Sequence, residues 1–439
     1  MTEKNTATYS KRSSTRVLFL CWGFSIHARR RVQIFVDDPG FQVAVVSTYD
    51  YGFPNATNIS LGGESINPSG SANTSSRLFP RKWLSPWIKE KLRQLLKLIG
   101  LWWEIAGAWR DLRTLRTTVE QFRPDIVFLQ TLQYPSYLAY GLSRSTPILI
   151  TFWNGDVTYY AKWTGLEMLV KRRLVVHGIK RAAAITVNSR TAFEKCLEHG
   201  AKAGQVHLIR YPGADLSRFK PGSRDAASRK IKTDSEKVVL CPRGLGSFFN
   251  SDVIIEAAAQ VISKIPSTLF LFISGVGGQA EWERHVTRAK ELGIADNLRW
   301  DGQVAWEDMP GYYQCADVMV SIKTNDSMPN CMIEAMACGV PVVMSDTPQN
   351  REWVDDGTNG FLCPPRAPAE CAAKILQVLR DSGDLAQRFS VINLDRVASE
   401  ANSVVNSERI KQLVKDLVHG KELVRSGEDS ITCGGLCEK

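Results

Sequence analysis

Short apolar runs alternate with segments of helical periodicity along most of the chain. In the first half, five runs rich in Val, Ile and Phe are predicted to be buried strands: Val17–Cys21, Val43–Ser47, Ile126–Leu129, Ile148–Phe152 and Ala184–Val187. A second series begins after residue 236 and comprises Val238–Cys241, Leu269–Ser274, Asn297–Trp300, Val318–Ser321 and Val342–Ser345. Alternating strands and helices are typical of parallel sheets covered on both faces, so the pattern predicts an α/β fold.

The segment from Leu216 to Glu236 interrupts this alternation. It contains Pro221, Gly222 and many charged or small polar residues, which is the composition of a linker. A chain of 439 residues is also too long for one hydrophobic core. We therefore predict two Rossmann-like domains with parallel sheets that face a central cleft, where ligands bind beyond the carboxyl ends of the strands. The predicted divisions are an N-terminal domain (1–222), a C-terminal domain (235–385), helices that pack back on the N-terminal domain (386–420) and an unstructured tail (425–439).

Two segments of the N-terminal half differ from their surroundings. Asn55–Ser76 is rich in Ser, Asn and Gly and is predicted to be a mobile loop. Residues 81–116 hold five tryptophans among Lys and Arg residues, with leucines at helical spacing, and predict a basic amphipathic helix or helix pair. Two interpretations remain open for this helix: it packs its apolar stripe on its own domain, or it holds the protein against an anionic membrane.

The composition of the chain limits the kinds of molecule that it is expected to bind. The formal net charge is +10, which suits nucleic acid, acidic lipid or a phosphorylated substrate. The chain has no zinc-finger spacing and no aromatic-basic RNA-binding signature, so we do not expect nucleic acid. The ten cysteines include no CxxC pair, and no apolar run is long enough to cross a membrane. We expect a reducing, cytoplasmic location, with peripheral contact to the inner face of the cell membrane.

The most informative stretch for chemistry runs from Asp326 to Asp346, D-S-M-P-N-C-M-I-E-A-M-A-C-G-V-P-V-V-M-S-D. Met328, Pro329 and Asn330 are predicted to begin a helix, because Pro is favoured in a first helical turn. Free amides there suit phosphate or sugar oxygens. Glu334 lies one turn inside this helix, and Asp326 lies in the loop before it.

This stretch resembles glycosyltransferase family 4, whose signature is two acids separated by seven positions followed by E-A-M-A-x-G-x-P-V-V. In that family the first acid, here Asp326, touches donor-sugar hydroxyls, and the second, here Glu334, binds the nucleotide ribose. The family usually has Glu at the first position, so Asp326 is shorter by one methylene. The resemblance implies the GT-B fold, a retaining mechanism and no metal or other cofactor besides a nucleotide-sugar co-substrate.

Other donor-side residues extend the resemblance. Arg243 follows the strand Val238–Cys241, where the family has an Arg on the donor pyrophosphate, and a surface ion pair is the alternative role. The Lys that usually follows is absent, since this chain reads Phe248-Phe249-Asn250-Ser251-Asp252. Gly275 and Gly277 resemble the family's glycine turn, and Gly302 resembles a glycine near the nucleotide base.

The N-terminal half extends the resemblance with Gly23, expected to bind the donor, and with residues expected to face the cleft and meet the acceptor or donor. Gly23, Ser25, His27 and Arg30 match a first-turn S-I-H-x-x-R motif, in which Gly23 would allow close approach to phosphate. Trp153 and Asp156 match the family's H-G-S-D segment, with Trp in place of His. A structural role for His27 and a loop-capping role for Asp156 remain open.

The implied function is transfer of a sugar from a nucleotide-diphosphate sugar to a hydroxyl of a glycan or lipid-linked acceptor, in cell-surface polysaccharide or glycoconjugate synthesis. Arg243, Asp326 and Glu334 are the expected catalytic residues. Two alternatives remain: a non-catalytic binding subunit of the same fold, and a nucleotide-sugar epimerase or phosphorylase.

Overall fold

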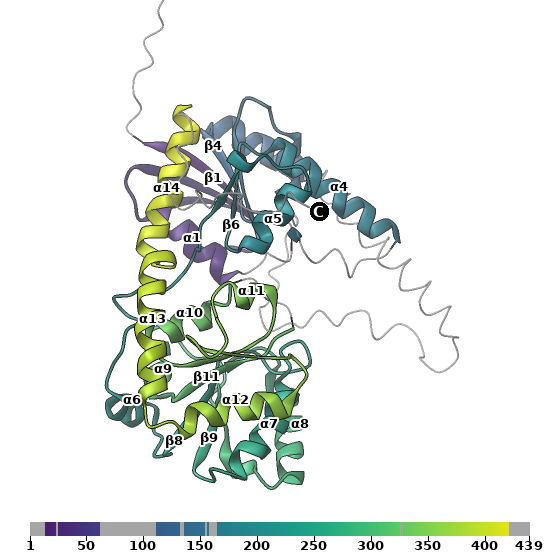
Figure 1. Ribbon diagram of the computed structural model, residues 1–439. Helices are drawn as coiled ribbons and strands as arrows, with labels where there is room; N and C mark the ends of the chain where they lie inside the picture. The colour runs from purple at the N-terminus through teal and green to yellow at the C-terminus, as the bar shows by residue number, and fades with distance from the viewer. Residues whose placement is uncertain are drawn as a thin grey trace, which may run out of the picture. The chain divides into compact units, whose positions relative to one another are not determined.

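The structure is a computed structural model and describes residues 14–22, 25–61, 111–131, 136–153, 156–157, 165–324, 326 and 328–420. The chain divides into two compact units. Unit 1 comprises Met1–Val187, Ala192–His207 and Arg409–Lys439, and unit 2 comprises Asn188–Thr191 and Leu208–Glu408. Each unit is built on a sheet flanked by helices (Figure 1).

The sheet of unit 1 has seven strands in the order β3-β2-β1-β4-β5-β6-β7. The strands are β1 (Thr15–Cys21), β2 (Phe41–Ser47), β3 (Ala56–Ser60), β4 (Ile126–Leu129), β5 (Ile148–Phe152), β6 (Ala184–Val187) and β7 (Val206–Leu208). β1 pairs in parallel with both β2 and β4, and Val17 is the partner of Val43 on one side and of Ile126 on the other. This order is that of a Rossmann sheet, and the five strands expected in this half are confirmed.

Helices and short 3-10 turns connect these strands. They are α1 (Ile26–Val36), η1 (Ser136–Gly141), α4 (Gly165–Arg181), α5 (Arg190–Glu198), η3 (Ala203–Gln205) and the C-terminal part of α14 (Ser403–His419). Residues 111–122 are also helical. Ser25 caps α1, because its hydroxyl accepts a hydrogen bond from the Ala28 amide at 3.3 Å. α14 is tied to this unit by an ion pair of 3.0 Å between Lys411 and Asp38.

The sheet of unit 2 has six strands in the order β10-β9-β8-β11-β12-β13. The strands are β8 (Lys237–Cys241), β9 (Thr268–Phe272), β10 (Leu298–Trp300), β11 (Val318–Ser321), β12 (Val342–Ser345) and β13 (Phe361–Cys363). Every pairing is parallel, and the order again matches a Rossmann sheet. The five strands expected in this half are confirmed.

Both faces of this second sheet are buried. Val238 and Leu240 join one hydrophobic core, whereas Val239 and Cys241 join the other. The first core includes residues of α6 (Arg224–Ile231), α9 (Met309–Cys315), α10 (Asn330–Ala337) and α13 (Asp384–Glu400). The second includes residues of α7 (Ser251–Ile262), α8 (Gly278–Glu291) and α12 (Pro368–Arg380), which lie together in Figure 1. The short elements η4 (Ala295–Asn297) and α11 (Pro348–Arg351) complete the unit.

Three strands were not expected, and all are short strands at sheet edges. β3 begins the segment predicted as a mobile loop, and its sequence Ala-Thr-Asn-Ile-Ser is largely exposed. β7 and β13 have three residues each. β3 lacks an apolar run because it is largely exposed, whereas β7 and β13 are too short for a sequence pattern to indicate them, although Phe361 and Cys363 of β13 are buried.

The segment predicted as a linker contains a helix, and that prediction is wrong over α6. Ser223 caps α6, and Ala227 and Ile231, one turn apart, are buried in the first core of unit 2. Arg224 also forms an ion pair of 2.8 Å with Asp317. The polar composition of this segment did not indicate a helix, because only one narrow stripe of α6 is buried.

The expected C-terminal helices are present as α13 and α14. α13 packs within unit 2, where Asn393 exchanges hydrogen bonds with Asn359, and only α14 reaches unit 1. Residues 81–110 of the basic amphipathic segment, Gly23, and the predicted tail over 425–439 lie outside the described residues. Among the described residues, no helix is both long and apolar enough to cross a membrane.

Candidate functional site

The loops that carry the expected donor residues meet at the carboxyl edge of the unit 2 sheet. Arg243 follows β8, Gly275 and Gly277 follow β9, Gly302 follows β10, and Asp326 follows β11. Because all these strands are parallel, the residues after them lie at one edge. The fold therefore gathers residues that are up to 83 positions apart in the sequence.

Arg243 and Asp326 form an ion pair at this edge. An Nη2–H of Arg243 donates to Oδ2 of Asp326, and Nη1 lies 4.0 Å from the sulfur of Cys331. Burial lowers the pKa of Arg243, but Asp326, Cys331 and Tyr313 together outweigh this effect, and the net shift of the pKa is upward. Among the described residues, the buried Nε of Arg243 has no hydrogen-bond acceptor. Because a guanidinium has five N–H groups, Arg243 has further donors beyond those that face Asp326 and Cys331.

Lys323 lies beside this pair and was not expected from the sequence. Its Nζ lies 3.9 Å from Oδ2 of Asp326, so one carboxylate faces two cations. The ammonium lies 4.4 Å from the centre of the Phe248 ring and 5.7 Å from that of Phe249. Burial lowers the pKa of Lys323. Phe248 and Phe249 belong to the segment in which the family's usual Lys is absent.

Glu334 is held inside α10 by a buried tyrosine. α10 begins at Asn330, close to the predicted start, but Pro329 is its N-cap and does not lie in its first turn, and Met328 is buried just before it. Tyr313 of α9 is fully buried and donates its hydroxyl to Oε2 of Glu334 at 3.0 Å. Burial and the Glu334 carboxylate both raise the pKa of Tyr313, which keeps the phenol protonated as a donor. Tyr313 is a second site residue that sequence reasoning missed.

The glycine turn after β9 packs tightly against the loop after β8. Gly277 has φ +102°, and a Cβ placed there would lie 2.7 Å from Cβ and 2.8 Å from the carbonyl oxygen of Leu245. The Leu245 amide donates to the Val276 carbonyl at 2.9 Å, which joins the two loops. The amide of Gly275 donates to Oε1 of Gln303 at 3.3 Å, and Gly302 has φ +67°. Glycine is needed at 277 for both conformation and space.

Asn250 ties three loops of this edge together. Its side-chain amide nitrogen donates to Ile322 O at 2.8 Å, to Thr324 Oγ1 at 3.0 Å and to Pro365 O at 3.1 Å. Asn250 is buried and adopts φ +54°, which Asn tolerates better than most residues. The loop that carries Lys323 is therefore held on both sides of that residue.

In unit 1, the expected acceptor residues gather around Trp153, at the carboxyl end of β5. The His27 ring lies 5.4 Å from the Trp153 ring, and the indole N–H donates to the Gln130 carbonyl at 2.7 Å. Asp156 accepts from the Trp153 amide at 2.9 Å and from the Thr131 hydroxyl at 3.0 Å. Asp156 thus has the loop-capping contacts that were considered for it.

Ser25 and Arg30 complete the expected set in unit 1. The Ser25 amide donates to the hydroxyl of Tyr51 at 3.1 Å, in addition to the capping bond of its side chain. Arg30 is half-buried on α1 and precedes Arg31, which is almost fully buried. Arg31 donates to the Thr151 hydroxyl and lies 5.5 Å from the Trp153 ring. Sequence reasoning did not single out this buried cation.

Gln130 follows β4 and contributes an unusual buried amide. Gln130 is 2% exposed, and within the part of the chain that the structure describes neither its Nε2 nor its Oε1 has a hydrogen-bond partner. The sequence carried no signal for it, because a lone Gln after a strand is ordinary.

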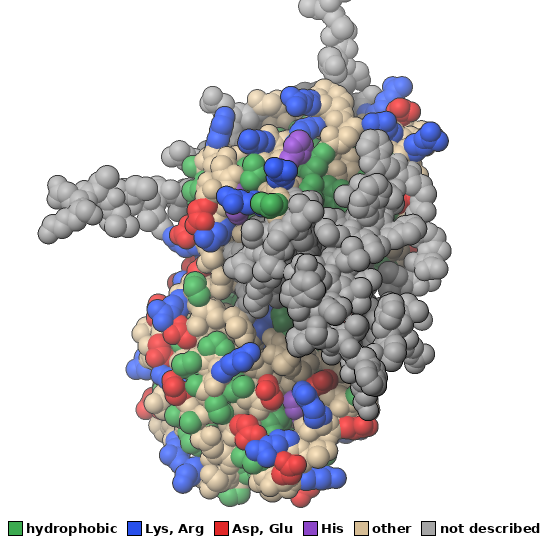
Figure 2. Space-filling model, turned by 90° about the vertical axis from the view of Figure 1, so that its right-hand side faces the viewer, with side chains coloured by type: hydrophobic (Ala, Val, Ile, Leu, Met, Phe, Trp, Pro, Cys, Tyr) green, Lys and Arg blue, Asp and Glu red, His purple; other side chains and the backbone are tan. Residues whose placement is uncertain are grey.

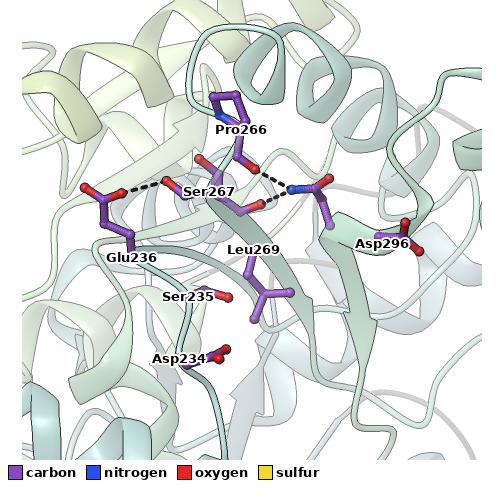
Figure 3. Close-up of a pocket in the computed structure, with 9 residues that line it drawn as sticks. Asp234, Ser235, Glu236, Pro266, Ser267, Leu269 and Asp296 are labelled. Atoms are coloured by element: carbon purple, nitrogen blue, oxygen red, sulfur yellow. Dashed lines mark hydrogen bonds between the residues drawn. The ribbon is translucent and has the colours of Figure 1, made fainter.

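A separate pocket of about 340 Å³ lies at the opposite edge of the unit 2 sheet (Figure 3). Its lining residues lie just before β8, β9 and β10 or in the first two positions of β9: Asp234, Ser235, Glu236, Pro266, Ser267, Thr268, Leu269, Asp296 and Asn297. Ser267 donates to Glu236 at 2.8 Å, and Asn297 donates to the carbonyls of Pro266 and Thr268. None of the expected site residues lines this pocket. Among the residues that the structure describes, no group of three or more His, Cys, Asp or Glu side chains is arranged to hold a metal.

Two family models match this chain. The model described as "Glycosyl transferase 4-like domain" matches residues 84–212, and the one described as "Glycosyl transferases group 1" matches residues 236–381. The second match includes Arg243, Asp326 and Glu334. Together the two matches span well over half of the chain.

The curated relatives match only part of this chain. D-inositol 3-phosphate glycosyltransferase of Geodermatophilus obscurus is 34% identical over 208 residues, which cover 46% of this chain and 46% of the relative. D-inositol 3-phosphate glycosyltransferase 2 of Catenulispora acidiphila is 29% identical over 258 residues, which cover 57% of this chain and 60% of the relative. The chain spans about half the length of the curated relatives it matches.

Solved structures match nearly the whole fold. Anabaena Alr3699/HepE in complex with UDP has a TM-score of 0.68 and 17% identity, with 92% of this chain and 100% of that chain covered. Sucrose-phosphate synthase of Thermosynechococcus elongatus has a TM-score of 0.70 and 18% identity, with 93% and 100% covered. At such identities the likeness concerns the fold. With two matched domains and this architecture, the chain belongs to the group 1 glycosyltransferases, the expected family 4 type, and has the GT-B fold.

Proposed function

We propose that this chain transfers a sugar from a nucleoside diphosphate sugar to an acceptor hydroxyl, with retention of the anomeric configuration. The observation that carries the proposal is the cluster of Arg243, Lys323 and Asp326 at the carboxyl edge of the unit 2 sheet, beside Glu334 of α10. A diphosphate needs cations, and a sugar and a ribose need carboxylates as hydrogen-bond acceptors. The cluster offers both kinds of group within one family-matched domain.

The reaction breaks the bond between the anomeric carbon and the diphosphate oxygen and forms a bond from that carbon to the acceptor oxygen. The acceptor attacks on the face from which the diphosphate departs, and its proton goes to a departing phosphate oxygen. Negative charge grows on the diphosphate as it leaves, so preorganised positive charge there lowers the barrier. Arg243 is placed for this task by its ion pair with Asp326, which uses only part of its set of five N–H donors.

Because side chains supply this positive charge, we expect turnover to need no divalent metal. Activity in excess EDTA should equal activity in buffer alone. A loss that added Mg²⁺ or Mn²⁺ restores would contradict this part of the proposal.

For the acceptor we propose a glycan or lipid-linked hydroxyl, handled at the cytoplasmic face of an anionic membrane during cell-surface polysaccharide or glycoconjugate synthesis. The net charge of +10 supports this setting, and most charged side chains on the face of unit 1 in Figure 2 are Lys or Arg. A phosphorylated polyol is the second candidate, favoured by the names of the curated relatives. Binding to phosphatidylglycerol vesicles at low salt tests the membrane setting, and no binding there would contradict it.

The first experiment is a melting-temperature screen against UDP, GDP, ADP and their common sugar conjugates. A ligand at 100 times its Kd adds about 2.7 kcal/mol to the free energy of unfolding. Each kcal/mol raises the melting temperature by roughly 2–4 °C in a domain of 150–250 residues. A shift with one diphosphate and its sugar conjugate is the expected result. Product analysis with lipid-linked glycans and inositol phosphate as acceptors then separates the two candidates. No shift with any nucleotide would favour a non-catalytic subunit.

A further inference from the structure

The chain carries a second cation at the proposed donor site, and neither the family pattern nor the sequence predicted it. We infer that Lys323 binds the diphosphate of the donor together with Arg243. This inference rests on the proposed function and adds a specific residue to it.

Two cations and one carboxylate lie together at the proposed donor site. Asp326 is the carboxylate that faces both cations, and its Oδ2 is hydrogen-bonded to Arg243. The same oxygen lies 3.9 Å from Lys323 Nζ, which exceeds hydrogen-bond length. A carboxylate carries one negative charge, so these three side chains together carry a net charge of +1. An anion is the ligand that balances it.

Both cations have hydrogen-bond donors that lack acceptors within the described part of the chain. Among the described residues, the Lys323 ammonium makes no hydrogen bond, although its side chain is only 14% exposed. The Arg243 Nε is buried and also has no partner. Desolvated donors without acceptors are unfavourable in the free protein. A ligand with several anionic oxygens, such as a diphosphate, can satisfy both residues at once.

Lys323 is held in place by the hydrogen bonds of its backbone and of its neighbours. The backbone on both sides of Lys323 is fixed, since Asn250 donates to Ile322 O and Thr324 Oγ1. The Lys323 carbonyl itself accepts a hydrogen bond from the Ser345 hydroxyl at 2.6 Å. The ring of Phe248 lies 4.4 Å from the ammonium and is 54% exposed, so it shields one side of the cation. A lysine held in this way loses little freedom on binding an anion.

A matched control residue is available in the same unit. Lys374 of α12 lies 2.9 Å from Asp356 and 4.8 Å from the ring of Phe361. It thus has the same two kinds of partner as Lys323. Lys374 has a direct hydrogen-bonded ion pair of its own and no second cation in that contact.

The test compares Lys323→Met, Lys323→Arg and Lys374→Met with the wild type by titration calorimetry. The probes are UDP, GDP, ADP, inorganic pyrophosphate and the three parent nucleosides. We expect Lys323→Met to weaken the preferred diphosphate about 10- to 100-fold, the range for a hydrogen bond to a charged group. Its affinity for the nucleoside should be unchanged. Lys323→Arg should retain most of the diphosphate affinity, and Lys374→Met should bind like the wild type.

The outcomes separate the inference from the proposed function. Wild-type affinity for the diphosphate in Lys323→Met, or an equal loss for diphosphate and nucleoside, would overturn the role of Lys323 and leave the function standing. An equal loss in Lys374→Met would show a general charge effect and overturn it as well. Failure of the wild type to bind any of the diphosphates would contradict the proposed function itself. If Lys323→Met does not fold, Lys323→Gln replaces it with the same expected result.

Discussion

The buried hydrogen bond between Tyr313 and Glu334 allows a sharp test of the nucleotide-binding site. Tyr313→Phe removes one oxygen atom and leaves the packing of α9 unchanged. Hydrogen bonds to charged groups contribute about 1.5–3 kcal/mol, and this one is fully buried with a length of 3.0 Å. We expect the free energy of unfolding to fall by about that amount.

The functional consequence depends on the ribose. If Glu334 binds ribose hydroxyls, loss of the Tyr313 hydroxyl removes one hydrogen bond that positions the carboxylate and weakens binding of the preferred nucleoside diphosphate. A loss of about tenfold corresponds to 1.4 kcal/mol, which lies within the range of one such bond. The assay is calorimetric titration of wild type and Tyr313→Phe with the diphosphate and with its 2′,3′-dideoxy analogue. The loss should be confined to the nucleotide that has the ribose hydroxyls.

Tyr312 provides a matched control one residue away on the same helix. Its hydroxyl donates to Asp301 at 2.8 Å, and Arg299 holds both oxygens of that carboxylate at 2.7 Å. Tyr312→Phe should therefore leave Asp301 in place and nucleotide affinity unchanged. An equal affinity loss for the natural and dideoxy nucleotides in Tyr313→Phe would refute the ribose argument and assign Tyr313 a purely structural role.

Three further variants test other parts of the structure. Arg243→Ala should lower kcat by about 10²–10³-fold, as expected for a lost electrostatic donor, whereas Arg288→Ala, which removes an exposed ion pair, should leave kcat unchanged; steady-state rates decide, and near-normal turnover would remove Arg243 from the mechanism. Gln130→Leu replaces an amide with two unpaired buried atoms and should raise the free energy of unfolding by about 1–3 kcal/mol; a lower urea midpoint would show that the amide is satisfied in solution. Gly277→Ala places a methyl group 2.8 Å from the Leu245 carbonyl oxygen at φ +102° and should cost about 1–3 kcal/mol; a stability equal to wild type would mean that the loop relaxes freely.

Prediction of the fold from the sequence succeeded where strands are buried on both faces. Val238–Cys241 is apolar throughout because alternate residues enter the two cores of unit 2. Prediction failed at sheet edges and at polar helices. β3 is largely exposed and α6 buries only a narrow stripe, so neither has the apolar pattern from which a strand or a helix is predicted.

The candidate site shows the same division. Asp326, Glu334 and the start of α10 lie within one continuous motif, so their spacing on a loop and a helix could be read directly. Arg243 could be placed after its strand by resemblance, but its ion pair with Asp326 joins residues 83 positions apart. That Arg243, Asp326 and Glu334 are catalytic stays a prediction; Arg243→Ala tests the first of them directly, and Tyr313→Phe tests the setting of Glu334.

The sequence by itself determined the α/β class, the two series of strands and the motif around Glu334, because these depend on burial patterns and spacing along a short length of chain. Only the tertiary structure brought Lys323 to Asp326, Tyr313 to Glu334, and Asn250 to the loop after β11. Lys323 lies outside the segment in which the family's lysine was sought. Such contacts arise because parallel strands bring their carboxyl ends to one edge, where side chains that are distant in sequence meet and share charge.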